Sequence, residues 1–182
     1  MTERGDIELQ IVNLLPRLRR FAIGLSGSTD EGDDLTQAAL LRALEKYEQW
    51  EPGTRLDSWI FRIIHTIWLD RRKSAGSRLV DVNSDELENR PDRSLIAEIE
   101  ARNELRQAWT AMAALPADQR EVLMLVAVEG YSYQETADFL GIPIGTVMSR
   151  LARGRVTVAQ KVRGVEESGI VAPRVRYDDG TK

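Results

Sequence analysis

The sequence predicts an all-α protein made of two small helical domains joined by a polar linker. Three observations support this fold class. Apolar residues recur at helical spacing along the chain, with neither the strict alternation of half-buried strands nor the turn dipeptides of hairpins. Hydrophobicity falls between residues 74 and 94, where polar residues dominate. The length of 182 residues suits one ordinary domain or two small ones.

The first domain is expected over residues 1–75. Its first helical region, Ile7 to Leu25, contains Pro16, and we expect a kink or a restart there because proline lacks the backbone donor and clashes with the preceding turn. A second helix begins near Ser28 or Thr29, where several acids favour the positive end of a helix, and it runs to about Gln49.

The third helix is expected from Arg55 to about Lys73, with Thr54 as its N-cap. Its basic last turn, residues 71–73, suits the negative end of a helix. The aromatic side chains at helical spacing, Trp59, Phe61 and Trp68, are expected in the core rather than stacked on nucleic-acid bases.

A linker is expected over residues 76–94, followed by a second domain over 95–163 and a tail over 164–182. Helical spacing continues from Leu95 to Leu115, and a further helix is expected from Asp118 to about Val128, ended by Gly130.

A helix-turn-helix motif follows. Ser132 and Glu135 form an S-x-x-E capping box that starts a short helix, Gly141 ends that helix, and a second helix starts near Gly145. Residue Ile144, in the turn, is expected on the buried side.

The second helix of the motif is expected to present a polar and basic face. If Val147 is at the centre of its buried side, an advance of about 100° per residue places Leu151, Gly154 and Val158 beside it. The residues that then point outward are Ser149, Ala152, Arg153 and Val156, flanked by Thr146 and Arg150 on one side and by Met148 and Arg155 on the other. Hydrogen-bonding side chains beside arginines are typical of a DNA recognition helix.

Composition narrows the function. The chain has no cysteine and one histidine, His65, which excludes thiolate zinc sites, disulfides, Cys-His dyads and two-histidine metal motifs. No phosphate-binding glycine loop is present. We therefore expect a binding protein without metal or cofactor rather than an enzyme. The formal charge is −4, yet residues 144–163 carry five basic residues and no acid.

No apolar run approaches the roughly 18 residues that a membrane span requires. The first residues, Met1 to Asp6, lack the basic and then apolar layout of a signal peptide. These two features predict a cytoplasmic protein.

Several segments resemble the bacterial extracytoplasmic-function (group 4) RNA polymerase sigma factors. Gln134 to Arg155 resembles their region 4.2, and Leu115 to Leu123 looks like region 4.1. In the N-terminal half, Asp33 to Leu44 resembles region 2.2, and Trp59 to Ile63 with Asp70 to Arg72 resembles region 2.4. The matches occur in the family's order and cover nearly all of residues 10–163.

The resemblance implies a subunit that binds core RNA polymerase and promoter DNA, directs promoter-specific initiation and is held inactive by an anti-sigma factor. It implies that Asp34 and Gln37 contact polymerase. The implied minus-10 contacts are Arg55, Arg62, His65, Thr66 and Arg71. The implied minus-35 contacts are Thr146, Ser149, Arg150, Arg153 and Arg155. Met148 stands where the family usually has a lysine or arginine, which removes one phosphate or base contact.

Two other classes of function remain open from the sequence. A sigma-like decoy would keep the fold to titrate an anti-sigma factor without binding DNA, and we would expect it to lose the recognition-helix arginines, which this chain retains. A helix-turn-helix repressor would need a dimerisation or ligand-sensing domain, for which the sequence gives no indication.

Overall fold

The computed structural model describes residues 3–75 and 96–166, and both parts are helical. The first domain comprises α1 (Glu3–Ser26), α2 (Thr29–Glu45), the short 3-10 turn η1 (Tyr47–Gln49) and α3 (Leu56–Ala75). The second domain comprises α4 (Ile96–Ala113), α5 (Ala117–Leu123), the π-helical turn η2 (Met124–Val128), α6 (Tyr133–Leu140) and α7 (Ile144–Glu166). The predicted all-α fold with two helical domains is confirmed for these residues.

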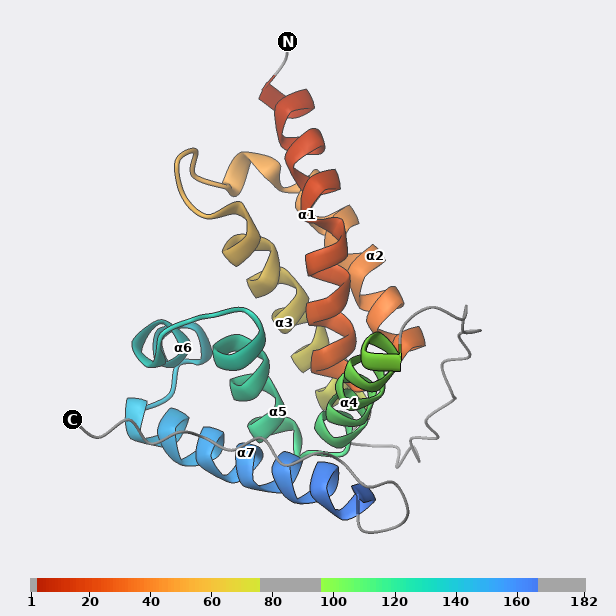
Figure 1. Cartoon of the computed structure of the whole chain (residues 1–182). Coiled ribbons are helices and arrows are strands. Elements are labelled where there is room, and N and C mark those ends of the chain that lie inside the picture. Colours follow the sequence, from red (N-terminus) through yellow and green to blue (C-terminus); the bar gives the residue numbers. More distant parts are fainter. Residues whose placement is uncertain (1–2, 76–95, 167–182) are drawn as a thin grey trace, which may run out of the picture.

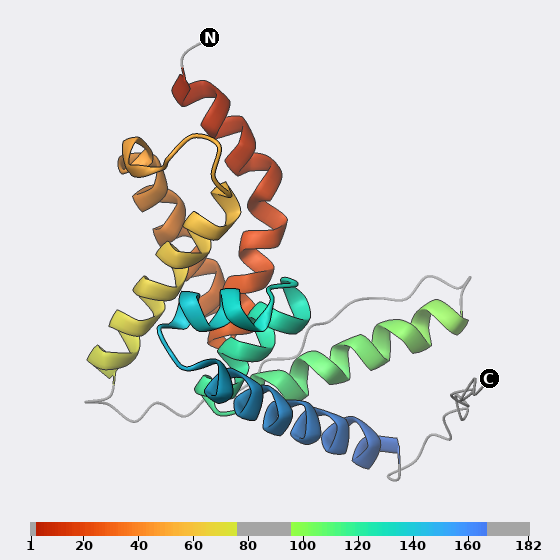
Figure 2. The same ribbon diagram turned by 90° about the vertical axis from the view of Figure 1, so that its left-hand side faces the viewer.

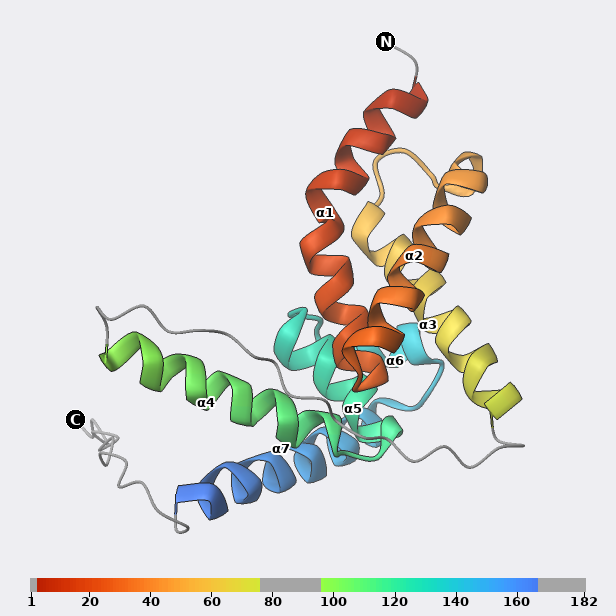
Figure 3. The same ribbon diagram turned by 90° about the vertical axis from the view of Figure 1, so that its right-hand side faces the viewer.

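The two domains pack directly on each other. Helices α1, α2 and α3 form an upright bundle, and the second domain lies across one end of it, as Figure 1 and Figure 2 show. Helix α7 is the outermost element of the second domain, on the side away from the bundle. Helix α4 lies beside α7, and both extend away from the bundle (Figure 3).

The apolar core continues from one domain into the other. One cluster of buried side chains includes Phe21 and Trp68 of the first domain together with Met124 and Val147 of the second. Close packing at the junction depends on Gly24 of α1, because a Cβ atom there would lie 2.9 Å from the ring of Trp109 and closer still to the side chain of Met124. The junction therefore leaves no room for a side chain at position 24.

Helix α1 shows that the predicted restart at Pro16 is wrong, since one helix runs from Glu3 to Ser26. Pro16 is exposed, so water can reach the carbonyl group that lost its donor. The buried side of the helix, which includes Ile11 and Leu18, packs on the rest of the bundle on both sides of the proline. This packing outweighs the local cost of proline.

Two other boundaries differ from the sequence-based expectation. Helix α2 starts as predicted, capped by Ser28, but ends at Glu45, ahead of the 3-10 turn η1. Thr54 does not cap α3: its hydroxyl donates to the carbonyl of Glu51, 2.7 Å away, and the helix begins at Leu56.

The helix expected to end near Val128 widens into the π-turn η2, in which the Glu129 amide donates to the Met124 carbonyl. Single π-turns inside α-helices often occur at functional sites. The predicted linker, residues 76–94, lies outside the described residues, and so does the tail beyond Glu166.

Candidate nucleic-acid interface

The helix-turn-helix forms as the sequence predicts. The Ser132 hydroxyl accepts a hydrogen bond from the Glu135 amide at 3.1 Å, and the Glu135 carboxylate accepts one from the Ser132 amide at 2.8 Å. The bond that the Ser132 amide donates to the carboxylate is the main cause that holds the pKa of Glu135 below its ordinary value. Gly141 ends α6 at φ +66°, a conformation that glycine adopts without strain. Helix α7 then starts at a fixed angle to α6.

Helix α7 buries one side and exposes the other, as predicted. Val147, Leu151 and Gly154 are buried against α5, and a Cβ atom on Gly154 would come 3.0 Å from Leu123. The residues exposed on the outer side are Met148, Ser149, Ala152, Arg153, Arg155 and Val156, whereas Thr146 is half-buried. Ile144, expected on the buried side, is instead 44% exposed, because the core closes on Phe139 and Val147.

Arg150 differs from the other arginines of α7. Its guanidinium lies 3.3 Å from Asp118 and 3.3 Å from Glu121, both on α5. The sequence around Arg150 contains no acid, so these partners were not foreseen. In this conformation Arg150 is paired within the second domain, while Arg153 and Arg155 are exposed to solvent.

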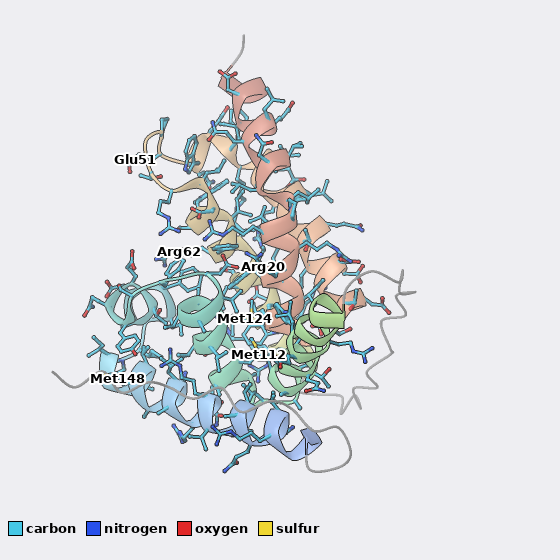
Figure 4. The ribbon with its side chains drawn as sticks, in the orientation of Figure 1. Arg20, Glu51, Arg62, Met112, Met124 and Met148 are labelled. Carbon is cyan, nitrogen blue, oxygen red and sulfur yellow. The ribbon has the colours of Figure 1, made fainter. Side chains whose placement is uncertain are left out.

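Three of the expected minus-10 residues lie against the second domain. The Arg62 guanidinium is 5.1 Å from the centre of the Phe139 ring, between α3 and α6 (Figure 4). His65 is buried, with its Nε2 atom 3.1 Å from a carboxylate oxygen of Glu121. The Arg55 guanidinium is 5.2 Å from the centre of the Tyr131 ring. Such cation–ring contacts stabilise an interface modestly.

The other two expected minus-10 residues do not join this group. Thr66 is exposed and donates its hydroxyl to the carbonyl of Arg62 at 2.8 Å. Arg71 lies half-buried near the end of α3. The structure therefore brings Arg55, Arg62 and His65 together at the junction and leaves Thr66 and Arg71 outside it.

A buried carboxylate at the junction was missed by the sequence analysis. The Glu129 side chain is fully buried, and its Oε2 atom accepts a hydrogen bond from Arg17 Nε at 2.6 Å. Its Oε1 atom lies 3.7 Å from Arg20, within ion-pair range but too far for a hydrogen bond. Arg17 also donates to Asp57 in its own domain. Arg17 thus joins a carboxylate of each domain.

Asp57 is the second carboxylate in this network. Burial alone would raise the pKa of Asp57, but hydrogen bonds from Arg55 and from the Ser58 amide, with the charge of Arg17, hold it below its ordinary value. The carboxylate is therefore ionised at neutral pH and available to both arginines.

Arg120 of α5 forms a further charged contact between the domains. It donates to the carbonyl groups of Leu25 and Ser26 at the end of α1, each at 3.0 Å, and to Ala113 of α4 at 2.6 Å. Carbonyl groups at a helix C-terminus lack helical partners and carry partial negative charge. One guanidinium therefore caps two helices from different domains.

The expected polymerase contacts lie elsewhere, on α2. Asp34 and Gln37 are both exposed, and their spacing places them on one side of the helix. The exposed Leu41 continues the same side. The neighbouring Asp33 differs, because Arg19 binds it at 2.6 Å and 2.9 Å, and this hydrogen bonding holds its pKa below the ordinary value.

A search of the described residues found no group of histidine, cysteine or acidic side chains arranged to hold a metal ion. None of the helices in these segments is both long and apolar enough to cross a membrane.

Comparisons with known proteins match both domains. Residues 105–158 match the family model described as Sigma-70, region 4, and residues 11–65 match the model of the Sigma2 domain of PhyR. The chain is 35% identical over 164 residues to the ECF RNA polymerase sigma factor EcfG of Rhodopseudomonas palustris (strain TIE-1), covering 87% of each protein.

Solved structures share the fold. The sigma factor RpoE from Bartonella quintana, solved in complex with the anti-sigma factor NepR, is 31% identical with a TM-score of 0.71, over 88% of this chain and 98% of that one. The NMR structure of the PhyRSL–NepR complex from Sphingomonas sp. Fr1 has a TM-score of 0.58 at 21% identity, over 94% of this chain and 98% of that one. This second likeness concerns the fold alone.

Proposed function

The chain belongs to the extracytoplasmic-function RNA polymerase sigma factors, and from this premise we propose how its two domains divide the work of promoter recognition. As a sigma factor it binds core RNA polymerase and directs promoter-specific initiation of transcription. We assign polymerase and minus-10 binding to residues 1–75 and minus-35 binding to residues 95–163, with 76–94 as the linker and 164–182 as a tail. The chain has no catalytic activity of its own and works in the cytoplasm.

The minus-35 contacts come from α7. Exposure of Ser149, Arg153 and Arg155 on its outer side supports this assignment, since these side chains are accessible to base edges and phosphates. Arg150 and the half-buried Thr146 complete the set, and Arg150 first leaves Asp118 and Glu121. Asp34 and Gln37 on the open side of α2 contact polymerase.

The minus-10 contacts come from α3 and the turn before it, through Arg55, Arg62, His65, Thr66 and Arg71. Burial of His65 and the contact of Arg62 with Phe139 support the view that the second domain covers part of this surface in the free chain. Polymerase binding separates the domains and exposes it. An anti-sigma factor holds the protein inactive, as NepR partners the related RpoE.

A sigma-like decoy is the second candidate, and one observation favours it: the first domain matches the Sigma2 domain of PhyR. The second domain argues against it. A decoy that does not bind DNA has no use for exposed arginines on its recognition helix, and Arg153 and Arg155 are both present and accessible. The exposed basic side of α7 is the observation that carries the sigma-factor assignment.

Run-off transcription separates the two functions. Purified core polymerase is mixed with a pool of promoters, with and without the protein, and initiation from a defined subset only in its presence is the expected result. The double variant Asp34→Ala/Gln37→Ala should lower affinity for core, while Asp30→Ala, an exposed acid on the same helix, should not. If no promoter responds and the protein still captures an anti-sigma factor, it is a decoy.

A further inference from the structure

An apolar stripe crosses the outer side of the recognition helix. It consists of Ile144, Met148, Ala152 and Val156, each four residues from the next, so that neighbours lie on one continuous ridge. Met148 is 52% exposed and Val156 is 56% exposed. Figure 4 labels Met148 near the start of α7. In the described part of the chain no residue covers this stripe.

The stripe is unexpected on a surface that must recognise DNA. None of its side chains can donate or accept a hydrogen bond of ordinary strength. The polar neighbours already have local partners: the Ser149 hydroxyl donates to the Thr146 carbonyl at 3.0 Å, and Arg153 Nε donates to the Ser149 carbonyl at 3.2 Å. Contiguous exposed apolar residues often mark an interaction site.

Because this inference rests on the proposed function, its occupant is promoter DNA. We propose that Met148, with Ile144 and Ala152 on either side, recognises the methyl groups of thymines in the minus-35 element. The thymine methyl is the apolar group that base pairs present in the major groove. The first turns of a recognition helix lie nearest the base edges, and these three residues occupy them. Val156, a turn further on, lies beyond the bases.

Charge and spacing favour DNA over a protein partner. Arg153 and Arg155 flank the stripe, and both are exposed, so an occupant that carries negative charge on either side of an apolar centre fits best.

Residues four apart on a helix are separated by roughly 6 Å along its axis. That distance corresponds to about two base-pair steps of roughly 3.4 Å each. The stripe therefore predicts two methyl-sensitive thymines about two base pairs apart, on either strand.

The test removes single methyl groups from the DNA. A minus-35 element is first selected from a randomised promoter library by the holoenzyme, and each thymine is then replaced by deoxyuridine, which keeps the hydrogen-bonding edge and loses only the methyl. At two positions about two base pairs apart, we expect each replacement to lower the affinity of the holoenzyme for the promoter about fourfold. This is the effect expected when one buried methyl group is lost from a contact. At the position beneath Met148, the variant Met148→Ala should abolish the difference between thymine and deoxyuridine.

Two controls isolate the effect. Arg155→Ala should weaken binding to all templates and leave the thymine-to-deoxyuridine ratio unchanged, because Arg155 contacts phosphate. Val156→Ala removes a similarly exposed apolar side chain from the same stripe and should also leave the ratio unchanged.

Several outcomes would overturn the inference. Promoter-dependent initiation that is indifferent to every methyl would refute it and leave the proposed function standing. A selected minus-35 element without thymine on either strand, or an unchanged ratio in Met148→Ala, would also refute it. If Met148→Ala weakens binding to core or to an anti-sigma factor with the ratio intact, the stripe is a protein contact. Absence of initiation from any promoter would overturn both proposals.

Discussion

The two surfaces expected to bind promoter DNA are in opposite states in the same molecule. On α3, Arg62 and His65 contact the second domain, and His65 is buried. Helix α7 is the outermost element of the second domain (Figure 1), and its Arg153 and Arg155 are exposed to solvent. The junction therefore covers part of the surface expected to bind the minus-10 element and leaves the surface expected to bind the minus-35 element open. We expect a free chain with this structure to sample duplex DNA through α7 more readily than it binds a minus-10 element.

The contacts across the junction explain the difference. Carboxylates of the second domain bind basic side chains of the first: Glu121 pairs with His65, an expected minus-10 residue, and Glu129 pairs with Arg17 and Arg20. Glu121 also holds Arg150 of the recognition helix, so one side chain restrains a residue of each DNA-binding surface. Opening the junction separates His65, Arg17 and Arg20 from these carboxylates, whereas the pair of Arg150 with Glu121 lies within the second domain and does not depend on the junction.

The largest expected effect comes from Arg120→Ala. The change removes two charged hydrogen bonds from α5 to the end of α1, and at about 1.5–3 kcal/mol each we expect the closed state to lose about 3–6 kcal/mol. The chain has no cysteine, so dyes attached through Glu51→Cys and Lys161→Cys report the distance between the domains by energy transfer. Transfer efficiency should fall, and single-stranded minus-10 DNA should gain affinity.

Arg106→Ala removes an exposed arginine of the second domain and serves as the matched control. Because Arg120 also caps α4, helical content and binding of duplex DNA through α7 should be measured alongside. If Arg120→Ala leaves the distance between the domains unchanged while the fold is intact, the junction does not depend on this residue.

A smaller opening is expected from Gly24→Ala. The new methyl would collide with the Trp109 ring and the buried Met124 side chain, and overpacking of this kind costs about 1–3 kcal/mol. Alanine also favours the helix by about 1 kcal/mol, so α1 itself should become more stable. We expect lower energy transfer together with unchanged or higher helical content.

Gly5→Ala is the control, since it lies in the same helix and its added methyl meets no atom within 4 Å. Opening in both variants would attribute the effect to the stiffness of α1 rather than to the junction.

Which of these features the sequence could predict depends on how far apart the partners lie along the chain. The capping box of Ser132 and Glu135 and the αL residue Gly141 are local signals, so the helix-turn-helix and the buried side of α7 were predicted correctly. Arg120 reaches a carbonyl group 95 residues away, and a backbone acceptor leaves no pattern in the sequence. The same holds for Arg17 and Glu129, which are 112 residues apart.

Two errors have a common cause. Pro16 and Ile144 were judged from neighbours in the sequence, which predicted a kink or a restart of the helix at Pro16 and a buried Ile144 side chain. Packing of the bundle keeps α1 continuous, and the second domain closes its core without Ile144. Local propensity gave way to tertiary contacts in both cases. The acidic partners of Arg150 were missed for the same reason, because they lie on another helix.

On the open surface, Arg153→Ala should cost about 1–2 kcal/mol of promoter binding, toward the lower end of the range for a base contact because part of its donor capacity already serves the Ser149 carbonyl. Preference at one or two minus-35 positions should relax. Arg155→Ala should weaken binding to all promoter sequences alike and reduce the salt dependence of binding by about one released counterion. Holoenzyme titrations across single-base minus-35 substitutions measure both.

Neither arginine variant should change the distance between the domains, and this separates the open surface from the closed one. A change in energy transfer in Arg153→Ala or Arg155→Ala would contradict the independence of the two surfaces. If Arg155→Ala reorders the preferred sequences and Arg153→Ala does not, the orientation of α7 in the groove is wrong.

The smallest effect tests a single hydrogen bond across the junction. The Tyr131 hydroxyl donates to the Ser58 hydroxyl at 2.6 Å, and removing it with Tyr131→Phe should favour opening by about 1 kcal/mol. A double-mutant cycle with Ser58→Ala isolates the pair, and a coupling energy near zero would show that the bond contributes nothing to closure.

Burial raises the pKa of the Tyr131 phenol above its usual value of 10.0, so the folded state holds this proton more tightly than the unfolded chain does. The stabilising contribution is thus fully present below pH 10.0 and declines as pH rises through the higher pKa of the folded state. Unfolding experiments at alkaline pH should show this decline in the parent chain, and Tyr131→Phe should lack it.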